Sequence, residues 1–221
     1  MKSSSPASAM APPCTGMSEI ESTRQYFQIY HDIVARLPYS EMDEMVEELL
    51  QRHRQEATVF LFGNGGSASL ASHFACDLGK GTVVNEGFGP RFRVIALTDN
   101  VSLITAWAND SSYERIFAEQ LQNLIRPGDV AFAISGSGSS PNVLAGLQAA
   151  RIAGGITMGL TGAQGAKMRA LCDYCVVLPS SNMQIIEDFH LGVAHAVFTV
   201  IRCRLATGLQ TRTLAKASAS D

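Results

Sequence analysis

Apolar residues recur at helical spacing from Met17 to about Arg54, before any run typical of a strand. A first set places Ile29 and Ile33 on one face, and a second set of methionines, valine and leucines forms another. Pro38 separates the two sets, and Ser40 after it is a plausible N-cap. The pattern therefore predicts two helices ahead of the core.

Short apolar runs and amphipathic segments alternate through the rest of the chain. Near-continuous apolar strands between helices are typical of a parallel sheet that is buried on both faces. The fold class predicted is α/β, a three-layer sandwich with a central parallel sheet of the doubly wound, flavodoxin-like kind, and with N-terminal helices added. The predicted strands span 58–62, 92–97, 129–134, 156–160 and 174–178, and the helices 68–78, 102–108, 113–124, 141–153, 166–171 and 184–207.

Length and composition indicate one domain without a membrane or nucleic-acid role. The 221 residues fit a single domain of residues 17–210, with disordered tails at 1–16 and 211–221. No apolar run approaches the roughly 20 residues that span a bilayer, and no secretory signal precedes the core, so we expect a cytoplasmic protein. A net charge of −3 gives no nucleic-acid footprint, and five scattered cysteines do not form a disulfide framework.

A glycine-rich turn follows the first predicted strand, in the sequence Gly63-Asn-Gly-Gly-Ser67. Its glycines let the backbone approach an anion, and Ser67 could cap the next helix, whose N-terminus favours negative charge. The lysine of a P-loop is absent, and the dinucleotide fingerprint fits poorly because Ala68 occupies its last glycine position. A purely structural turn explains this segment about as well as a binding site does.

A second turn follows the third predicted strand and is rich in serine. Hydroxyl groups there, with backbone N–H groups and the start of a helix at Pro141, would form a neutral cradle for phosphate. The alternative is a flexible polar loop, which becomes less attractive because two such turns occur in one small domain. The turn contains Ser135, Gly136, Ser137, Gly138, Ser139 and Ser140.

Two helices carry polar side chains that their apolar faces do not explain. His73 and Asp77 are four residues apart and lie on one face of the first helix. The last helix carries Glu187, His190 and His195, and Glu187 lies near both histidines on a broad face. Periodicity does not choose between His190 and His195, and a satisfied core histidine is the ordinary alternative for either.

The two turns together resemble those of the sugar isomerase (SIS) family, and most closely those of its phosphoheptose isomerases. The resemblance extends over about Arg24 to Leu205 and includes Asn109-Asp110, Thr161-Gly162 and the closing helix Ile186 to His195. It implies an aldose–ketose isomerase for a sugar phosphate, with sedoheptulose 7-phosphate as the expected substrate. It also implies a homotetramer with active sites at subunit contacts.

The resemblance further implies roles for individual residues. Asp77 and His195 would be the acid/base pair that moves a proton between C1 and C2 through an enediol. One zinc ion per site is expected on His73, Asp77, Glu187 and His195. The residues matching substrate-binding positions are Asn64, Gly65, Gly66, Ser67, Asp110, Ser135, Gly136, Ser137, Ser140 and Glu187.

Three positions depart from the family pattern. Asp77 stands where a glutamate is expected, Glu187 replaces a glutamine, and Gly136 replaces a threonine. The shorter carboxylate could lose proton transfer, the added charge favours a divalent metal, and the missing hydroxyl weakens the cradle. Two alternatives therefore stay open, an isomerase for another phosphosugar and a non-catalytic SIS protein that acts as a regulator, as those that bind the replication initiator DnaA do.

Overall fold

The computed structural model describes residues 20–83 and 90–217, with side chains as far as residue 207. Its centre is a five-stranded sheet in the order β2-β1-β3-β4-β5, in which every neighbouring pair is parallel. The strand order reverses between β1 and β3, which is the arrangement of a doubly wound fold. The strands are β1 Thr58–Gly63, β2 Arg93–Ala96, β3 Val130–Ser135, β4 Ile156–Thr161 and β5 Tyr174–Val177.

Helices cover both faces of the sheet, as the apolar strands require. Successive strand residues point to opposite faces, so Val59 and Leu61 join one core cluster while Phe60 and Phe62 join the other. The first face carries α2 (Tyr39–Arg54), α3 (Gly66–Cys76) and α8 (Met183–Ala217). The second carries α5 (Ile116–Leu124), α6 (Pro141–Ile152) and the short α7 (Ala166–Arg169), with α4 (Val101–Asp110) packed on α5. The three-layer prediction is confirmed.

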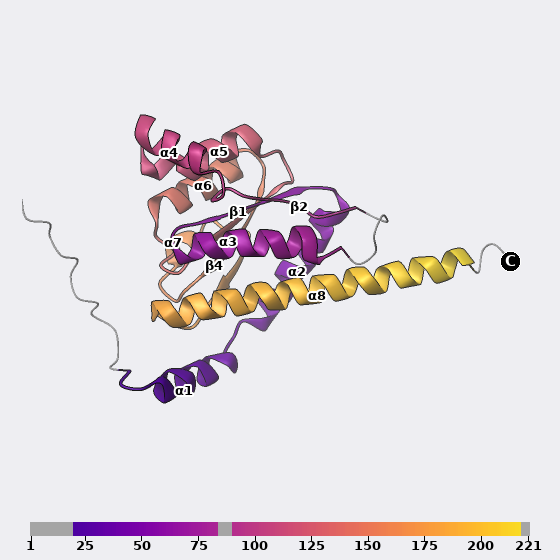
Figure 1. Ribbon diagram of the computed structural model, residues 1–221, viewed down its shortest axis with the longest axis horizontal. Helices are drawn as coiled ribbons and strands as arrows, with labels where there is room; N and C mark the ends of the chain where they lie inside the picture. The colour runs from indigo at the N-terminus through magenta and orange to yellow at the C-terminus, as the bar shows by residue number, and fades with distance from the viewer. Residues whose placement is uncertain (1–19, 84–89, 218–221) are drawn as a thin grey trace, which may run out of the picture.

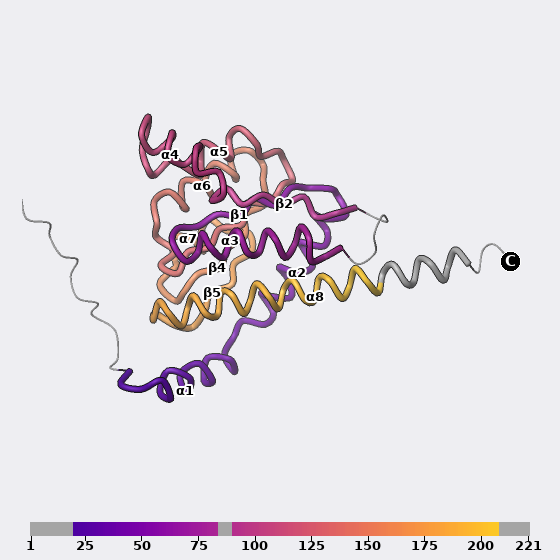
Figure 2. Tube along the Cα trace, viewed as in Figure 1, coloured from indigo at the N-terminus to yellow at the C-terminus, as the bar shows by residue number. Residues whose placement is uncertain are grey.

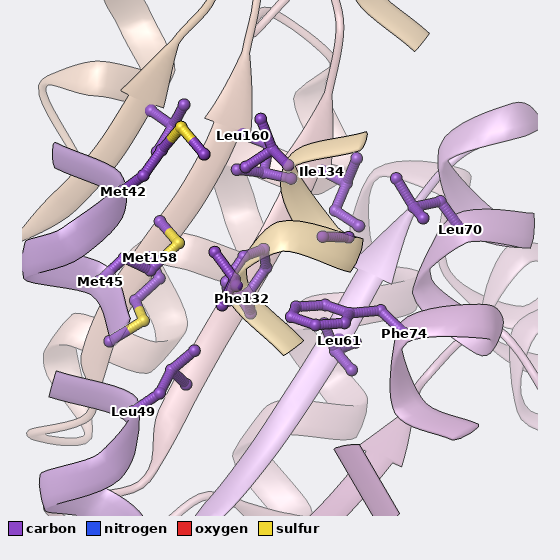
Figure 3. Close-up of a cluster of buried hydrophobic side chains, with 14 of the residues drawn as sticks. Met42, Met45, Leu49, Leu61, Leu70, Phe74, Phe132, Ile134, Met158 and Leu160 are labelled. Atoms are coloured by element: carbon purple, nitrogen blue, oxygen red, sulfur yellow. The ribbon is translucent and has the colours of Figure 1, made fainter. Parts of the chain in front are cut away.

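The larger core cluster fixes the helices that carry the site. In Figure 3 the methionines and leucine of α2 lie at the left of this cluster, and Leu70 and Phe74 of α3 lie at its right. Both helices pack on the same face of the sheet. Phe74 meets Phe132 of β3 edge to face, with ring centroids 5.5 Å apart. Burial of such side chains stabilises a domain by about 1.5–3 kcal/mol each, so α3 is held firmly over the sheet.

Helix α1 (Thr23–Val34) lies apart from the sheet in Figure 1 and contacts the start of α8. The Tyr26 hydroxyl donates to Asp188 at 2.5 Å, and Tyr30 stacks on Phe189 at 4.1 Å. Burial and the Asp188 carboxylate raise the pKa of Tyr26 to about 12. Phe27 on the same helix is 66% exposed, so α1 presents apolar surface beyond what this chain covers.

Several element boundaries differ from the prediction. Helix α2 begins at Tyr39 with Pro38 in the cap position, so Ser40 lies inside the helix and is not its N-cap. Helix α8 continues to Ala217, beyond the predicted end near residue 207 and into the stretch expected to be a tail (Figure 1). In Figure 2 the coloured part of the same helix runs beside α3. The predicted tail at 1–16 lies outside the described residues.

A window of α8 is long and apolar enough to cross a membrane by length and composition, contrary to our estimate from the sequence. The same helix packs against α2 and α3 and places Ile185, Ile186 and Val193 in the core. Its apolar character therefore has an explanation within the fold.

Candidate active site

Both predicted turns lie at the carboxyl edge of the sheet, on the two central neighbouring strands. The first follows β1 and leads into α3, and the second follows β3 and leads into α6. This edge, where the strand order reverses, is where doubly wound folds bind ligands. The site is therefore assembled from two turns and from the helices α3 and α8, which run side by side in Figure 1.

The first turn exposes the backbone at the start of α3. Gly65 has φ = +55°, a conformation that favours glycine, and serves as the N-cap without a side-chain hydrogen bond. Ser67 lies inside the first helical turn and is 7% exposed, so its predicted capping role is wrong. The helix begins before Ser67 because the glycines turn the chain earlier. The free N–H groups at this end face a ligand site.

Glu187 of α8 reaches across to the same helix start. A Cβ atom built on Gly66 would lie 3.0 Å from Glu187 Oε1, so glycine is what lets the carboxylate approach. A cavity of about 280 Å³ opens here, between α3 and α8. Its lining consists of Gly66, Ser67, Ser69, Leu70, His73, Glu187, Asp188, His190 and Leu191.

His73, Asp77 and His195 come together farther along the two helices. The Nε2 atoms of the two histidines are 2.9 Å apart, and Asp77 Oδ2 lies 3.3 Å from His73 Nε2 and 3.7 Å from His195 Nε2. The predicted helix over 68–78 ends at Cys76, and a π-helical turn, Asp77–Gly81, begins at the carboxylate. Such turns are rare and frequently occur at functional sites.

The three side chains form a set that could hold a divalent metal ion. One ligand atom from each lies within 4.8 Å of the others. Asp77 Oδ2 is buried without a hydrogen bond, so it is an acceptor in need of a cation or a proton. Two imidazole nitrogens and a carboxylate oxygen suit zinc. The structure brings together three of the four predicted ligands, and the ligand role of Glu187 stays a prediction.

The second turn is held by its own serines. Ser135 is buried, and its Oγ accepts a hydrogen bond from Gly138 N–H at 3.2 Å. Ser137 Oγ accepts one from Ser139 N–H at 3.3 Å, whereas the Ser140 side chain makes no capping bond at the start of α6. The Ser140 hydroxyl and the Asn142 N–H are therefore available to an anion, whereas Pro141 has no N–H and Val143 N–H already donates to Asn142 Oδ1.

The glycine at position 136 has a steric reason. A Cβ atom there would lie 2.4 Å from Met183 Sδ and 3.4 Å from a methyl carbon of Ile186. The start of α8 thus fills the space that a larger residue would need. Where the family pattern has a threonine, this chain has a glycine against which α8 packs closely.

Asp110 lies at the exposed end of α4, where its Oδ1 accepts a hydrogen bond from Asn109 Nδ2 at 2.7 Å. The Asn64 side chain forms hydrogen bonds with Asn142 and Tyr113, two residues that were not among the predicted site residues. The sequence contained one indication of a role for Asn142: asparagine is a poor helix former, yet it occupies the first turn of α6 directly after the serine-rich turn.

The structure separates the two histidines of α8. His195 is about half exposed and lies beside Asp77, whereas His190 is 1% exposed and lies beneath the cavity. Burial lowers the pKa of His190 to about 4, although the nearby backbone of Thr161 acts in the opposite direction. Of the two, His195 is therefore the histidine that lies beside the Asp77 carboxylate and is open to solvent.

Comparison with known proteins agrees with this geometry. The profile of the SIS domain matches residues 25–162. Phosphoheptose isomerases of Trichlorobacter lovleyi and Roseiflexus sp. are 37% and 39% identical over 72% and 71% of this chain and 79% and 78% of their own. The solved structure of a phosphoheptose isomerase from Neisseria gonorrhoeae superposes with a TM-score of 0.74 at 28% identity, covering 80% of this chain and 95% of that one.

A doubly wound sheet with a glycine-rich turn after β1 and a serine-rich turn after β3, matched by the SIS domain profile, places the chain among α/β proteins of the SIS class. At the identities found, the chain belongs to the SIS domain family and, within it, to the phosphoheptose isomerases.

Proposed function

We propose that the protein is an aldose–ketose isomerase that converts sedoheptulose 7-phosphate to D-glycero-D-manno-heptose 7-phosphate. The observation that carries this proposal is the contact of Asp77 and His195 with each other and with His73, a residue that lines the cavity together with Gly66 and Ser67 of the glycine-rich turn. The names of the relatives support the substrate, and the geometry supports the reaction class.

The proton-transfer pair acts on adjacent carbons. One of the two groups removes a proton from C1 of the ketose while O2 gains a proton, which gives the enediol. The enediol then loses its O1 proton and gains a proton at C2, and the aldose results. A histidine side chain can perform both steps near neutral pH, and Asp77 lies close enough to share the proton.

The phosphate would bind at the second turn. Its oxygens would accept hydrogen bonds from the Ser137 and Ser140 hydroxyls and from the Asn142 N–H at the start of α6, while Ser135 holds the turn in shape. Sugar hydroxyls would then extend toward Asn64, Ser67, Asp110 and Glu187. Gly65 leaves open space beside the backbone, whereas Gly66 and Gly136 give room to the side chains of Glu187 and Met183, which border the turns.

We propose zinc as the metal, held by His73, Asp77 and His195, with Glu187 as the fourth ligand expected from the family. When bound, zinc would polarise the substrate oxygens as a Lewis acid. The residues fit the ion because one ligand atom from each of His73, Asp77 and His195 lies within 4.8 Å of the others, and the Asp77 oxygen is buried without a hydrogen bond. Metal content of protein purified without chelator tests this assignment.

We propose a cytoplasmic homotetramer whose partners are sugar phosphates, with no nucleic-acid or membrane role. The exposed Phe27 of α1 and the apolar helix α4, which has no buried residue, support association. These surfaces suit helix packing between copies of the chain.

The alternatives are an isomerase for another phosphosugar and a non-catalytic SIS regulator. An assay with several ketose phosphates, read by deuterium uptake from solvent into the sugar, distinguishes all three. We expect His195→Ala to abolish this uptake and weaken zinc binding while the fold survives, since the side chain is half exposed. His190→Gln should keep the metal. Metal loss in His190→Gln but not in His195→Ala would contradict the choice of histidine.

A further inference from the structure

Asn64 of the first turn is held by side chains from two other segments. Its Nδ2 donates to Asn142 Oδ1 at 2.8 Å, and its Oδ1 accepts from Asn142 Nδ2 at 2.8 Å and from the Tyr113 hydroxyl at 3.1 Å. Asn142 lies in the first turn of α6, and Tyr113 begins the short helix η2 (Tyr113–Arg115). One amide thus connects the first turn, the start of α6 beside the serine-rich turn, and η2.

The orientation of both amides is fixed by a backbone group. Val143 N–H donates to Asn142 Oδ1 at 2.9 Å, and a backbone N–H can only donate. The atom of Asn142 at that place is therefore oxygen, and the Asn64 atom facing it must be nitrogen. The reciprocal contact then places Asn142 Nδ2 opposite Asn64 Oδ1. A flip of either amide alone would bring two oxygens and two nitrogens face to face and would break both hydrogen bonds.

This arrangement leaves Asn64 with one hydrogen-bond donor, and no acceptor, for a ligand. Two donors occupy both lone pairs of Asn64 Oδ1, and one of the two Nδ2 hydrogens is used by Asn142. Among the residues that the structure describes, none accepts the other hydrogen, and Asn64 is half-buried rather than enclosed. Asn64 can therefore donate to an acceptor oxygen but cannot accept from a hydroxyl.

We propose that Asn142 and Tyr113 are positioning residues that hold Asn64 as a one-hydrogen donor to an acceptor oxygen of the bound sugar phosphate. The proposal rests on the proposed function for the identity of the ligand. The acceptor is either a phosphoryl oxygen or an oxygen of the sugar. Asn142 is 2% exposed, so the network is formed before the ligand arrives and need not be ordered by binding.

The test removes one donor at a time. Asn142→Asp keeps the acceptor for Val143 and for the Asn64 amide but replaces the donor by a carboxylate oxygen. Asn64 then loses its fixed orientation, and we expect KM for sedoheptulose 7-phosphate to rise about tenfold with a smaller change in kcat. Tyr113→Phe removes only the second donor and should raise KM about threefold.

Matched controls make the same chemical changes elsewhere. Asn100→Asp keeps an acceptor for Leu103 N–H, and Tyr174→Phe removes a hydroxyl that donates to Glu48 at 3.0 Å. Both should leave KM within twofold of the wild type. The proposal is overturned if KM of the Asn142→Asp variant changes no more than KM of the Asn100→Asp variant does. If Asn142→Asp does not fold, a Tyr113→Phe variant indistinguishable from Tyr174→Phe overturns it.

Two further measurements separate the possible outcomes. Inorganic phosphate, tested as a competitive inhibitor, should bind more weakly in Asn142→Asp if the acceptor is a phosphoryl oxygen, and unchanged inhibition with a raised KM assigns a sugar oxygen. Calorimetric titration of sedoheptulose 7-phosphate in a His195→Ala background measures binding without turnover. A wild type that binds the sugar phosphate but does not isomerise it refutes the proposed function, while the same titrations still decide the role of Asn142.

Discussion

His190 should make the stability of the native protein depend on pH. The side chain is 1% exposed, and neither ring nitrogen has a hydrogen-bond partner of ordinary geometry among the described residues. Burial lowers its pKa from 6.5 to about 4. Above pH 6.5 the ring is neutral in the folded and the unfolded chain, so it contributes no pH dependence there.

Between pH 6.5 and 4 the unfolded chain gains a proton that the native chain refuses. The free energy of unfolding therefore falls by about 1.4 kcal/mol per pH unit, or roughly 3 kcal/mol across the window. His190→Gln and His190→Leu remove the titrating group, and their loss of stability between pH 7 and about pH 4.5 should be smaller by roughly 2 to 3 kcal/mol.

Urea unfolding followed by circular dichroism at equal protein concentrations measures this difference. Two variants are needed because each alters packing differently, whereas both remove the same proton equilibrium. Their stability near pH 7 can differ from that of the wild type without bearing on the argument. Equal losses on acidification in the wild type and in both variants would show that His190 is not a buried neutral base.

Three other predictions concern the site and the assembly. The double variant Ser137→Ala, Ser140→Ala should raise KM for the sugar phosphate several-fold, at about 1 kcal/mol or more for each hydroxyl, with thermal unfolding unchanged; an unchanged KM places the phosphate elsewhere. Glu187→Ala should reduce zinc affinity less than His195→Ala does, because Glu187 lies over Gly66 and outside the three-residue group; an equal or larger loss in a zinc titration would show that Glu187 binds the ion as strongly as the histidine does. Phe27→Glu should shift light scattering toward smaller assemblies, since this ring is 66% exposed on α1, and a wild type that is already monomeric at micromolar concentration would refute the tetramer.

The fold was predictable because its central strands β1, β3 and β4 are buried on both faces. Val59 to Phe62 reads as one apolar run, and the structure sends its alternate residues into two different cores. Boundaries were less predictable where a neighbour decides them. Ser67 carries the side chain of an N-cap, yet Gly65 turns the chain before it because the positive φ is accessible to glycine.

The site was predictable only as far as local spacing reaches. His73 and Asp77 are four residues apart, so their contact follows from helix geometry, although the π-helical turn at Asp77 has no such signature. Periodicity did not distinguish His190 from His195, and only the family resemblance pointed to His195. The packing of α8 in the structure separates the two, because it buries His190 and leaves His195 beside Asp77. Asn64 and Asn142 are separated by 78 positions, and no pattern in one sequence indicates that their amides pair.

The three departures from the family pattern have local explanations in this chain. Asp77 is shorter than glutamate, but it still lies 3.3 Å and 3.7 Å from the two histidines, so the proton-transfer pair remains in contact. The extra charge of Glu187 lies at the N-terminus of α3, where a carboxylate is stabilised by the helix dipole without any metal. Gly136 accommodates Met183, whose sulfur fills the space that a threonine side chain would occupy. Each change therefore alters the walls around the substrate while leaving Asp77 and His195 together, which favours a retained isomerase over a non-catalytic regulator.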